Sequence, residues 1–297
     1  LKKEKPIKYD TENLIAYKKF YGVSLEEEVD VILPLAKLGI EGTGSMGDDT
    51  PMPVLSKQSR SLYDYFRQQF AQVTNPPIDS LREASVMSLE TCLGVERNLF
   101  DESSLHAGRL ILESPILSNQ VFKKLLSYHK KGFPGDTLSI HYDKNIDLEE
   151  AINTICDRAV RSVKKGNVLI ILSDQGLNKD QLTIPAAMAV GAVHHRLINE
   201  GVRCDCNIIV ETASTWNSHH FAVLLGYGAS AIYPYLAFNI INDLIVRNSV
   251  DTKAYASHVQ NFIKGINKGL LKIMSKMGIS CVSSYRGAQL FETIGIN

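Results

Sequence analysis

Apolar and polar residues follow a repeating pattern from about residue 109 to the end of the chain. Short apolar runs that suit strands are each followed by a stretch with helical spacing. The run 168–174 is apolar up to Ser173 and Asp174, as in a fully buried strand of a parallel sheet. We count six such strand-then-helix units, with strands predicted at 109–113, 137–143, 168–174, 206–211, 230–233 and 279–282.

The order of these elements predicts the fold class. Strands and helices that alternate at this spacing form parallel sheets joined by right-handed crossovers. We therefore expect an α/β fold whose six βα units fill 109–297, either (β/α)-barrel-like or, as the alternative, an open doubly wound sheet. The matching helices are predicted at 119–128, from Asp147, and at 185–199, 217–225, 255–276 and 288–294.

The N-terminal part of the chain lacks this alternation. Residues 1–23 are polar and Lys-rich with scattered aromatic residues, so we interpret them as a linker from a preceding domain. The capping box 24–27 starts a helix predicted over 25–38, with a bend at Pro34. We expect the rest of the chain, 24–297, to form a single domain.

Two long loops occupy much of the region 24–108. Residues 44–53 and 72–79 are dense in Gly, Pro, Asn, Asp, Ser and Thr, and have neither helical nor strand periodicity. Helices are predicted at 61–72 and 81–89 around the second loop. Loops this long in a compact domain are usually functional or disordered, and their varied composition favours function.

Composition narrows the classes of function. The chain has 297 residues and 32 basic and 32 acidic side chains, so it carries no net field to attract nucleic acid or an anionic membrane. No run is long enough to span a bilayer. The five cysteines are scattered and odd in number, which favours reduced thiols and a cytoplasmic location.

A glycine-rich string at 42–47 matches the dinucleotide fingerprint G-x-G-x-x-G. The context argues against that function, because a helix precedes the string where a strand is needed. Asp48 and Asp49 follow it where a helix should receive the pyrophosphate. The acidic pair has no third ligand nearby, so it suits a turn better than a metal site.

Histidine and cysteine pairs offer little chemistry. His194 and His195 are adjacent on a predicted helix and point about 100° apart, which does not suit one shared ion. His219 and His220 lie in the first turn of another predicted helix, without the H-E-x-x-H spacing. We expect packing and hydrogen bonding for all four, and we interpret the C-x-C at 204–206 as a result of burial or chance.

Carboxylates at the ends of predicted strands give the best case for catalysis. Glu113, Asp143, Asp174 and Glu211 would converge on one edge if their strands share a sheet. Converging carboxylates shift each other's pKa and can perform acid–base chemistry. This pattern leaves two interpretations open: a barrel-type lyase or hydrolase, or a rim of acids that are paired or solvated.

Familiar nucleophile and phosphate-binding motifs are absent from the sequence. It contains no G-x-S-x-G, P-loop or kinase signature. The segment 283–287, Ser-Ser-Tyr-Arg-Gly, lies between the last predicted strand and a helix. It suits either an anion cradle or a capping turn.

Several long segments resemble the central domain of the glutamate synthase large subunit. The resemblance covers nearly the whole chain from about Ser24. It rests on 44–51, 70–79, 82–83, 219–222, 226–229, 233–237, 269–280, 284–285 and 287–289. In that family an amidotransferase domain releases ammonia from glutamine, and an FMN-binding barrel with an iron–sulfur cluster uses it to aminate 2-oxoglutarate.

The resemblance implies a non-catalytic, connecting role within glutamate biosynthesis. It implies a degenerate barrel that positions the amidotransferase and FMN-binding domains of the same polypeptide. FMN and the iron–sulfur cluster are expected in the rest of the enzyme, and no cofactor or metal in this domain. Trp216, Tyr233 and Tyr235 stand where a flavin phosphate would need small residues.

The resemblance also implies that this domain helps to wall an ammonia tunnel. The positions that match the family's motif are Gly44, Ser45, Met46, Gly47, Thr74 and Asn75. Small or neutral residues suit this role, because a lining carboxylate would trap the cation. We expect Asp48 and Asp49 to point away and to fix the turn.

Overall fold

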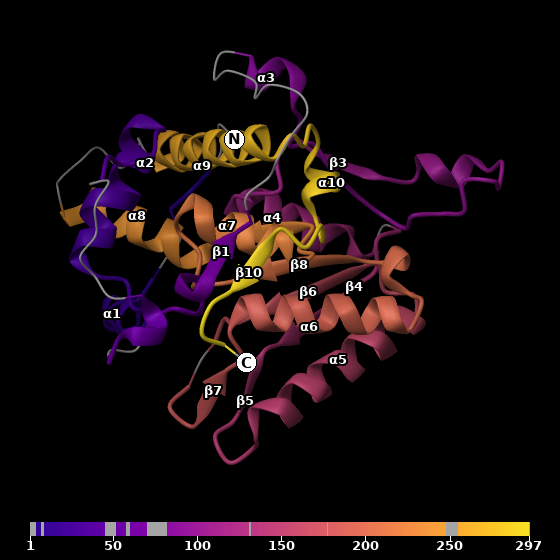
Figure 1. Ribbon diagram of the computed structural model, residues 1–297, viewed down its shortest axis with the longest axis horizontal. Coiled ribbons are helices and arrows are strands. Elements are labelled where there is room, and N and C mark those ends of the chain that lie inside the picture. The colour runs from indigo at the N-terminus through magenta and orange to yellow at the C-terminus, as the bar shows by residue number, and fades with distance from the viewer. Residues whose placement is uncertain are drawn as a thin grey trace.

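A parallel sheet of four strands lies at the centre of the protein. The computed structural model describes residues 4–6, 9–44, 52–57, 60–69, 82–130, 132–176, 178–247 and 255–296. The sheet has the order β4-β6-β8-β9, and all neighbouring pairs are parallel (Figure 1). Its strands are β4 (Gly135–Ser139), β6 (Leu169–Ser173), β8 (Asn207–Glu211) and β9 (Ala231–Tyr233).

The chain before α4 continues this sheet at the outer edge of β9. Ile116 forms a parallel bridge with Ile232, whose amide donates to the carbonyl of Pro115 over 2.7 Å. Mixed α/β structure with a parallel sheet is therefore confirmed. In the described residues this sheet has four parallel strands and this bridge at its edge, so the expectation of six parallel strands is wrong.

Most helices that accompany the parallel strands occur where the sequence predicts them. Each of α4, α5 and α7 begins at a side-chain cap: Ser118, Asp147 and Asn217 accept from backbone amides. Helices α5 and α6 lie side by side against the sheet (Figure 1). The bounds are α4 (Asn119–Ser127), α5 (Leu148–Lys164), α6 (Ala186–Asn199), α7 (Ser218–Gly226) and α9 (Tyr255–Met277).

Helix α8 (Tyr235–Arg247) is not predicted by the sequence. Most of its residues are buried, because it packs against α9, α1 and the segment after residue 26. A helix that is apolar on most sides gives a weak amphipathic signal. The sequence pattern therefore passes from the strand at 230–233 directly to the helix at 255–276.

The segment interpreted as a linker contains helix α1 (Thr11–Tyr21), which packs on α8. Lys18 lies 2.5 Å from Glu28 and 3.4 Å from Asp243, and Arg247 contacts the same two carboxylates. Glu28 is ten positions from Lys18, and Asp243 is 225 positions away. The polar segment gives little local signal of a docked helix, because both partners lie outside it.

The helix predicted at 61–72 is wrong in its described part. A short 3-10 turn, η3 (Leu62–Tyr65), leads into β1 (Phe66–Gln68). Strand β1 pairs antiparallel with β10 (Phe291–Thr293), which lies within the helix predicted at 288–294. Each segment becomes a strand because of a partner more than 200 residues away, and local apolar spacing does not show that partner.

Two predicted strands exist outside the parallel sheet. The strand at 109–113 is β3 (Leu110–Leu112), which pairs antiparallel with β2 (Thr91–Leu93). The strand at 137–143 divides after Ser139, and its second part is β5 (His141–Asp143), paired antiparallel with β7 (Gln181–Thr183). The predicted strand at 279–282 is reduced to one parallel bridge between Ser88 and Cys281.

Short elements complete the described structure. Between β2 and β3 the chain projects as an arm (Figure 1) whose Leu99 and Phe100 are 90% and 94% exposed. No described helix is both long enough and apolar enough to cross a membrane. The short elements are η2 (Pro53–Leu55), α3 (Glu83–Val86), η4 (Ser104–Ala107), η5 (Tyr128–Lys130), η6 (Arg203–Asp205) and α10 (Val282–Tyr285).

The helix predicted over 25–38 is present, with a π-helical stretch η1 (Glu27–Ile32) before α2 (Leu33–Leu38). Pro34 has no N–H to donate to the carbonyl of Asp30. The backbone of Gly42 approaches that carbonyl so closely that a Cβ on Gly42 would overlap it. The first glycine of the G-x-G-x-x-G string therefore has a packing role.

Replacing Gly42 with alanine should destabilise the fold. We expect Gly42→Ala to lower the free energy of unfolding by about 1–3 kcal/mol, because the new methyl group meets backbone atoms that cannot move cheaply. Gly44→Ala is the matched control, since no described atom lies within 4 Å of its added Cβ. Urea denaturation of both variants measures the difference, and equal midpoints would contradict the packing role.

Candidate functional site

Two of the four predicted carboxylates meet at the carboxyl edge of the parallel sheet. Asp174 directly follows β6, and Glu211 ends the neighbouring strand β8. Glu113 follows β3, and Asp143 ends β5, so both belong to antiparallel pairs and are exposed. The condition for convergence of all four carboxylates is not met, because the strands that carry Glu113 and Asp143 do not join this sheet.

Asp174 is 1% exposed and is held by groups from the next strand end. Thr212 donates its hydroxyl to Oδ2 over 2.5 Å, and the amide of Ala213 donates to Oδ1 over 3.0 Å. Tyr235 donates its hydroxyl to the backbone carbonyl of Asp174 over 3.2 Å. Burial raises the pKa of Asp174 to about 6, although its hydrogen bonds act in the opposite direction.

Glu211 is also satisfied within the protein. Its Oε2 accepts from the Ser173 hydroxyl over 2.6 Å, and the two residues are register partners in the sheet. Burial raises the pKa of Glu211, while this hydrogen bond lowers it. The two strand-end acids thus have hydrogen-bond donors from neighbouring strands.

Helix α1 covers this edge. The hydroxyl of Tyr17 accepts from the amide of Gly176 over 3.0 Å, two residues beyond Asp174. Its ring lies edge-on to Tyr235, with centroids 6.1 Å apart, and stacks with Tyr21 at 6.1 Å. Space at the ends of β6 and β9 is therefore filled by aromatic side chains from the N-terminal helix.

A second group of aromatic residues closes the end of β8. Tyr63 stacks on His220 with centroids 4.3 Å apart, and its hydroxyl lies 3.1 Å from that of Ser214. Trp216 is buried and donates its indole N–H to Glu27 over 2.7 Å. Burial lowers the pKa of His220 well below its ordinary value, so the ring packs as the neutral form.

The bulky residues noted in the sequence lie at this edge. Tyr233 stacks on Phe122 with centroids 4.5 Å apart and donates its hydroxyl to Asn119 over 3.1 Å. Tyr233, Tyr235 and Trp216 are each 4% exposed. These side chains pack into the protein interior and leave little surface there for a ligand.

His219 and His194 have hydrogen-bond partners as well. His219 contacts the backbone carbonyl of Tyr63 over 2.9 Å, and His194 accepts at Nδ1 from Arg203 over 2.9 Å. Burial, followed by the charge of Arg203, lowers the pKa of His194 to about 4. Among the described residues no three His, Cys, Asp or Glu side chains gather as a metal site would require.

The predicted tunnel residues fall almost entirely outside the described residues. Gly44 is described and exposed, at the end of the segment that begins after α2. Ser45, Met46, Gly47, Thr74 and Asn75 lie outside the described residues, as do Asp48 and Asp49. Their role in a tunnel stays a prediction.

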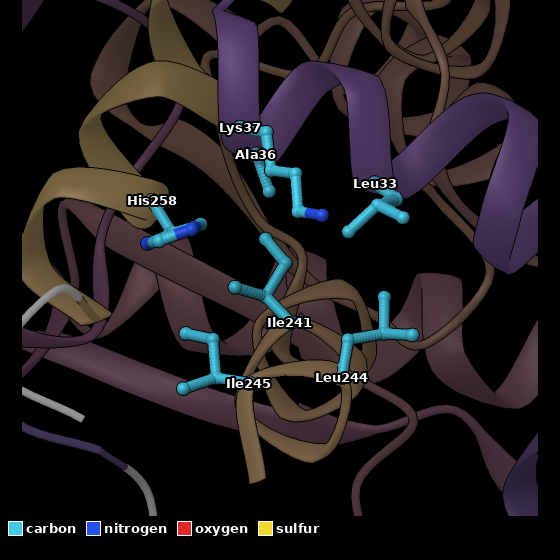
Figure 2. Close-up of a pocket in the computed structure, with 7 residues that line it drawn as sticks. All are labelled: Leu33, Ala36, Lys37, Ile241, Leu244, Ile245 and His258. Carbon is cyan, nitrogen blue, oxygen red and sulfur yellow. The ribbon is translucent and has the colours of Figure 1, made fainter. Parts of the chain in front are cut away.

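A small apolar crevice separates α2, α8 and α9 (Figure 2). Leu33 and Ala36 face Ile241 and Leu244 across it, with Lys37 and His258 at its sides. Its volume of about 10 Å³ is close to the least that one water molecule needs. The crevice is therefore a packing gap between helices, and too small for a substrate.

Sequence reasoning missed the residues that close the carboxyl edge. Tyr17 and Tyr21 come from the segment interpreted as a linker, and Tyr63 comes from a predicted helix that did not form. The spacing of Tyr17 and Tyr21, four residues apart, is a helical signal that could have indicated a docked face. Nothing in the sequence near Tyr63 indicates its contact with His220.

Comparison with known proteins identifies relatives over nearly the whole chain. The family model described as the glutamate synthase central domain matches residues 16–297. The ferredoxin-dependent glutamate synthase of Oryza sativa subsp. japonica is 42% identical, over 97% of this chain and 19% of that protein. The NADPH glutamate synthase large chain of Bacillus subtilis is 40% identical, over 96% and 19%. The chain thus spans about a fifth of these relatives.

Solved structures give a weaker likeness. A lactate oxidase from Pediococcus acidilactici aligns with a TM-score of 0.48 and 12% identity, covering 98% of this chain and 97% of that one. The recombinant flavin-binding domain of baker's yeast flavocytochrome b2 aligns with a TM-score of 0.38 and 12% identity, covering 63% and 49%.

The buried carboxyl of Asp174 should give stability a distinctive pH dependence. The folded protein binds this proton more tightly than the unfolded chain, so stability from this group falls as pH rises from 3.8 to about 6. Asp174→Asn should therefore gain stability relative to the parent across that window, by at most about 3 kcal/mol.

Urea unfolding across this pH range measures the difference between Asp174→Asn and the parent. Asp143→Asn is the matched control, because it removes an exposed aspartate at the end of β5. A difference for Asp174→Asn that is constant with pH would show that the carboxyl is not held protonated by burial.

Proposed function

This chain belongs to the glutamate synthase central domain family, and we propose that it acts there as a non-catalytic connecting domain. In this proposal it positions an amidotransferase domain and an FMN-binding domain of the same polypeptide during glutamate synthesis from glutamine and 2-oxoglutarate. The chain matches only 19% of its relatives' length, which leaves room for both.

One observation carries the non-catalytic part of the proposal. In parallel α/β enzymes the chemistry lies at the carboxyl edge of the sheet. Here that edge is filled by Tyr17, Tyr235 and Trp216, and the carboxylate of Asp174 is committed to Thr212 and Ala213. A catalytic carboxylate needs access to a substrate, and this one has none through the described residues.

The rival function, a barrel-type lyase or hydrolase, is not favoured by the geometry. It requires Glu113, Asp143, Asp174 and Glu211 to converge, and only Asp174 and Glu211 lie at neighbouring strand ends. The carboxylate of Glu211 also accepts a hydrogen bond from Ser173, so it is not free to act on a substrate.

We place the cofactors in the other domains. FMN and an iron–sulfur cluster belong to the proposed partner domain, which would perform the reductive amination. The stacked and buried rings of Tyr233 and Tyr235 support the view that no flavin phosphate enters this domain. The location proposed for the whole enzyme is cytoplasmic.

The positioning role is supported by the surface of the arm between β2 and β3. Leu99 and Phe100 are almost fully exposed, and Leu105 is 58% exposed. Ile111, in the adjoining strand β3, is 65% exposed. Apolar surface gathered on a projecting element is typical of a contact with another folded unit. A neighbouring domain of the same polypeptide would supply that contact.

The tunnel role concerns the two loops 44–53 and 72–79. Ammonia in water is mostly ammonium, which does not attack a carbonyl, so transfer between active sites needs a path that excludes water. Neutral and small side chains such as Gly44, Ser45 and Thr74 suit such a wall, since they neither block it nor bind a cation. Met46, Gly47 and Asn75 complete the proposed lining.

The non-catalytic role predicts the behaviour of this 297-residue chain on its own. We expect a purified sample to show no flavin absorbance and no release of ammonia from glutamine. We also expect no glutamate formation from 2-oxoglutarate with ammonia and a reductant. Absorbance spectroscopy and the two assays measure this, and activity in either assay would overturn the connecting role.

The tunnel role predicts an uncoupling variant of the complete synthase. Thr74→Trp should leave glutamine hydrolysis intact while glutamate formation from glutamine falls and ammonia escapes into solution. Thr154→Trp is the matched control, because Thr154 is exposed on α5. The ratio of the two activities is the readout, and a ratio equal to that of the control would remove Thr74 from the path.

A further inference from the structure

A second cavity lies at the opposite, amino edge of the sheet. Its volume is about 390 Å³, within the range of sites for small molecules. Ser230, directly before β9, lies in its wall, and the bridge between Ser88 and Cys281 lies beside it. Its lining includes Thr91, Cys92, Glu96, Arg109, Ser283 and Arg286.

Two arginines from distant parts of the chain face this cavity. Arg109, just before β3, donates to the carbonyl of Val95 over 2.8 Å. Arg286, just after α10, donates to the hydroxyl of Ser230 over 3.3 Å. Their side chains are 25% and 17% exposed, so both are anchored and partly desolvated.

A third arginine adds positive charge behind them. Arg203 donates to the carbonyls of Cys206 and Gly228 over 2.8 and 2.9 Å. Burial lowers the pKa of Arg286, the charge of Glu96 raises it, and the charge of Arg109 lowers it. Burial likewise lowers the pKa of Arg203, and Arg286 adds to that effect. The guanidinium groups therefore lie close enough to repel one another.

Negative charge in the lining of this cavity comes from the exposed carboxylates of Glu96 and Glu90. Glu96 lies 3.8 Å from Arg109 and 3.6 Å from Arg286, which are long contacts for a charged pair, and its side chain is 47% exposed. Glu90 also lines the cavity and is exposed. Solvated carboxylates compensate buried guanidinium groups poorly, so the site keeps an attraction for anions.

We propose that this cavity binds a small organic anion through Arg109 and Arg286. A guanidinium group offers a planar pair of N–H donors that matches the oxygens of a carboxylate or a phosphate. The hydroxyls of Ser230 and Ser283 add polar atoms to the same wall. The ligand displaces Glu96 from its two long contacts. This site is separate from the carboxyl edge and is independent of the connecting role.

The segment 283–287 is the sequence feature that points to this site. Its sequence suits either an anion cradle or a capping turn, and α10 is too short to provide a helix terminus for binding. The structure instead brings Arg286 of this segment to Arg109 of the arm. The anion site therefore depends on two side chains that are 177 positions apart in the sequence.

Calorimetric titration of the chain tests the proposal and identifies the ligand chemistry. Inorganic phosphate and succinate are titrated separately at low ionic strength, and binding of either supports the site. Arg286→Gln should raise the dissociation constant about tenfold or more, since hydrogen bonds to charged groups contribute about 1.5–3 kcal/mol. Arg158→Gln, an exposed arginine on α5, should bind as the parent does.

The thiol of Cys281, which lines the cavity, can report on anion binding. Hydrogen bonds from Ser283 and Ser284 lower the pKa of Cys281, which favours its reactive thiolate. A bound anion should slow alkylation of Cys281 by iodoacetamide in the parent, and this protection should be lost in Arg286→Gln. Mass spectrometry of the Cys281 peptide measures the rate in both proteins.

Three results would overturn the proposal. The first is absence of binding of both anions at millimolar concentration. The second is binding that Arg286→Gln leaves unchanged. The third is protection of Cys281 that is equal in the parent and in Arg286→Gln. If Arg286→Gln fails to fold by circular dichroism, Arg286→Lys replaces it, because it keeps the charge but loses the planar fork, and weaker binding is again expected.

Discussion

Burial of the Asp174 carboxyl is the constraint around which the carboxyl edge of the sheet is organised. Once water is excluded, that group needs donors from the protein, and Thr212 and Ala213 supply them only if β8 ends beside β6 in the observed register. Exclusion of water in turn depends on the aromatic cover from α1. That helix stays in place because Lys18 reaches Glu28 and Asp243, so the N-terminal segment and the sheet edge stabilise each other.

The sequence predicts those parts of the fold whose cause is local. The apolar run of β6 and the capping residue Asp147 of α5 carry their structure in their own neighbourhood, and both are found as predicted. Strand β1 cannot be predicted from its own neighbourhood, because its hydrogen bonds go to β10 at the other end of the chain. The site follows the same rule. Asp174 and Glu211 could be placed from strand ends, whereas Tyr17, Tyr63 and the partnership of Arg109 with Arg286 depend on contacts that no local pattern contains.

The two edges of the sheet differ in how their charges are satisfied. At the carboxyl edge, Asp174 and Glu211 receive donors from the strands themselves, and aromatic rings occupy the remaining space. At the amino edge, Arg109 and Arg286 share one half-exposed carboxylate across a cavity. A fold of this class ordinarily places its chemistry at the first edge. Because side chains fill the carboxyl edge, the amino edge is where the described residues leave an unfilled polar cavity.

The proposed connecting role requires a unique geometry more than high stability, and the buried polar groups fit that requirement. A raised pKa means that ionised Asp174 costs stability at neutral pH, so an apolar residue of similar size would give a more stable edge. An apolar edge, however, would tolerate slippage between β6, β8 and α1, because apolar contacts lack direction. Hydrogen bonds at 2.5 and 3.0 Å allow only one register. The same reasoning applies to Lys18, whose ion pairs with Glu28 and Asp243 fix where helix α1 packs on the domain.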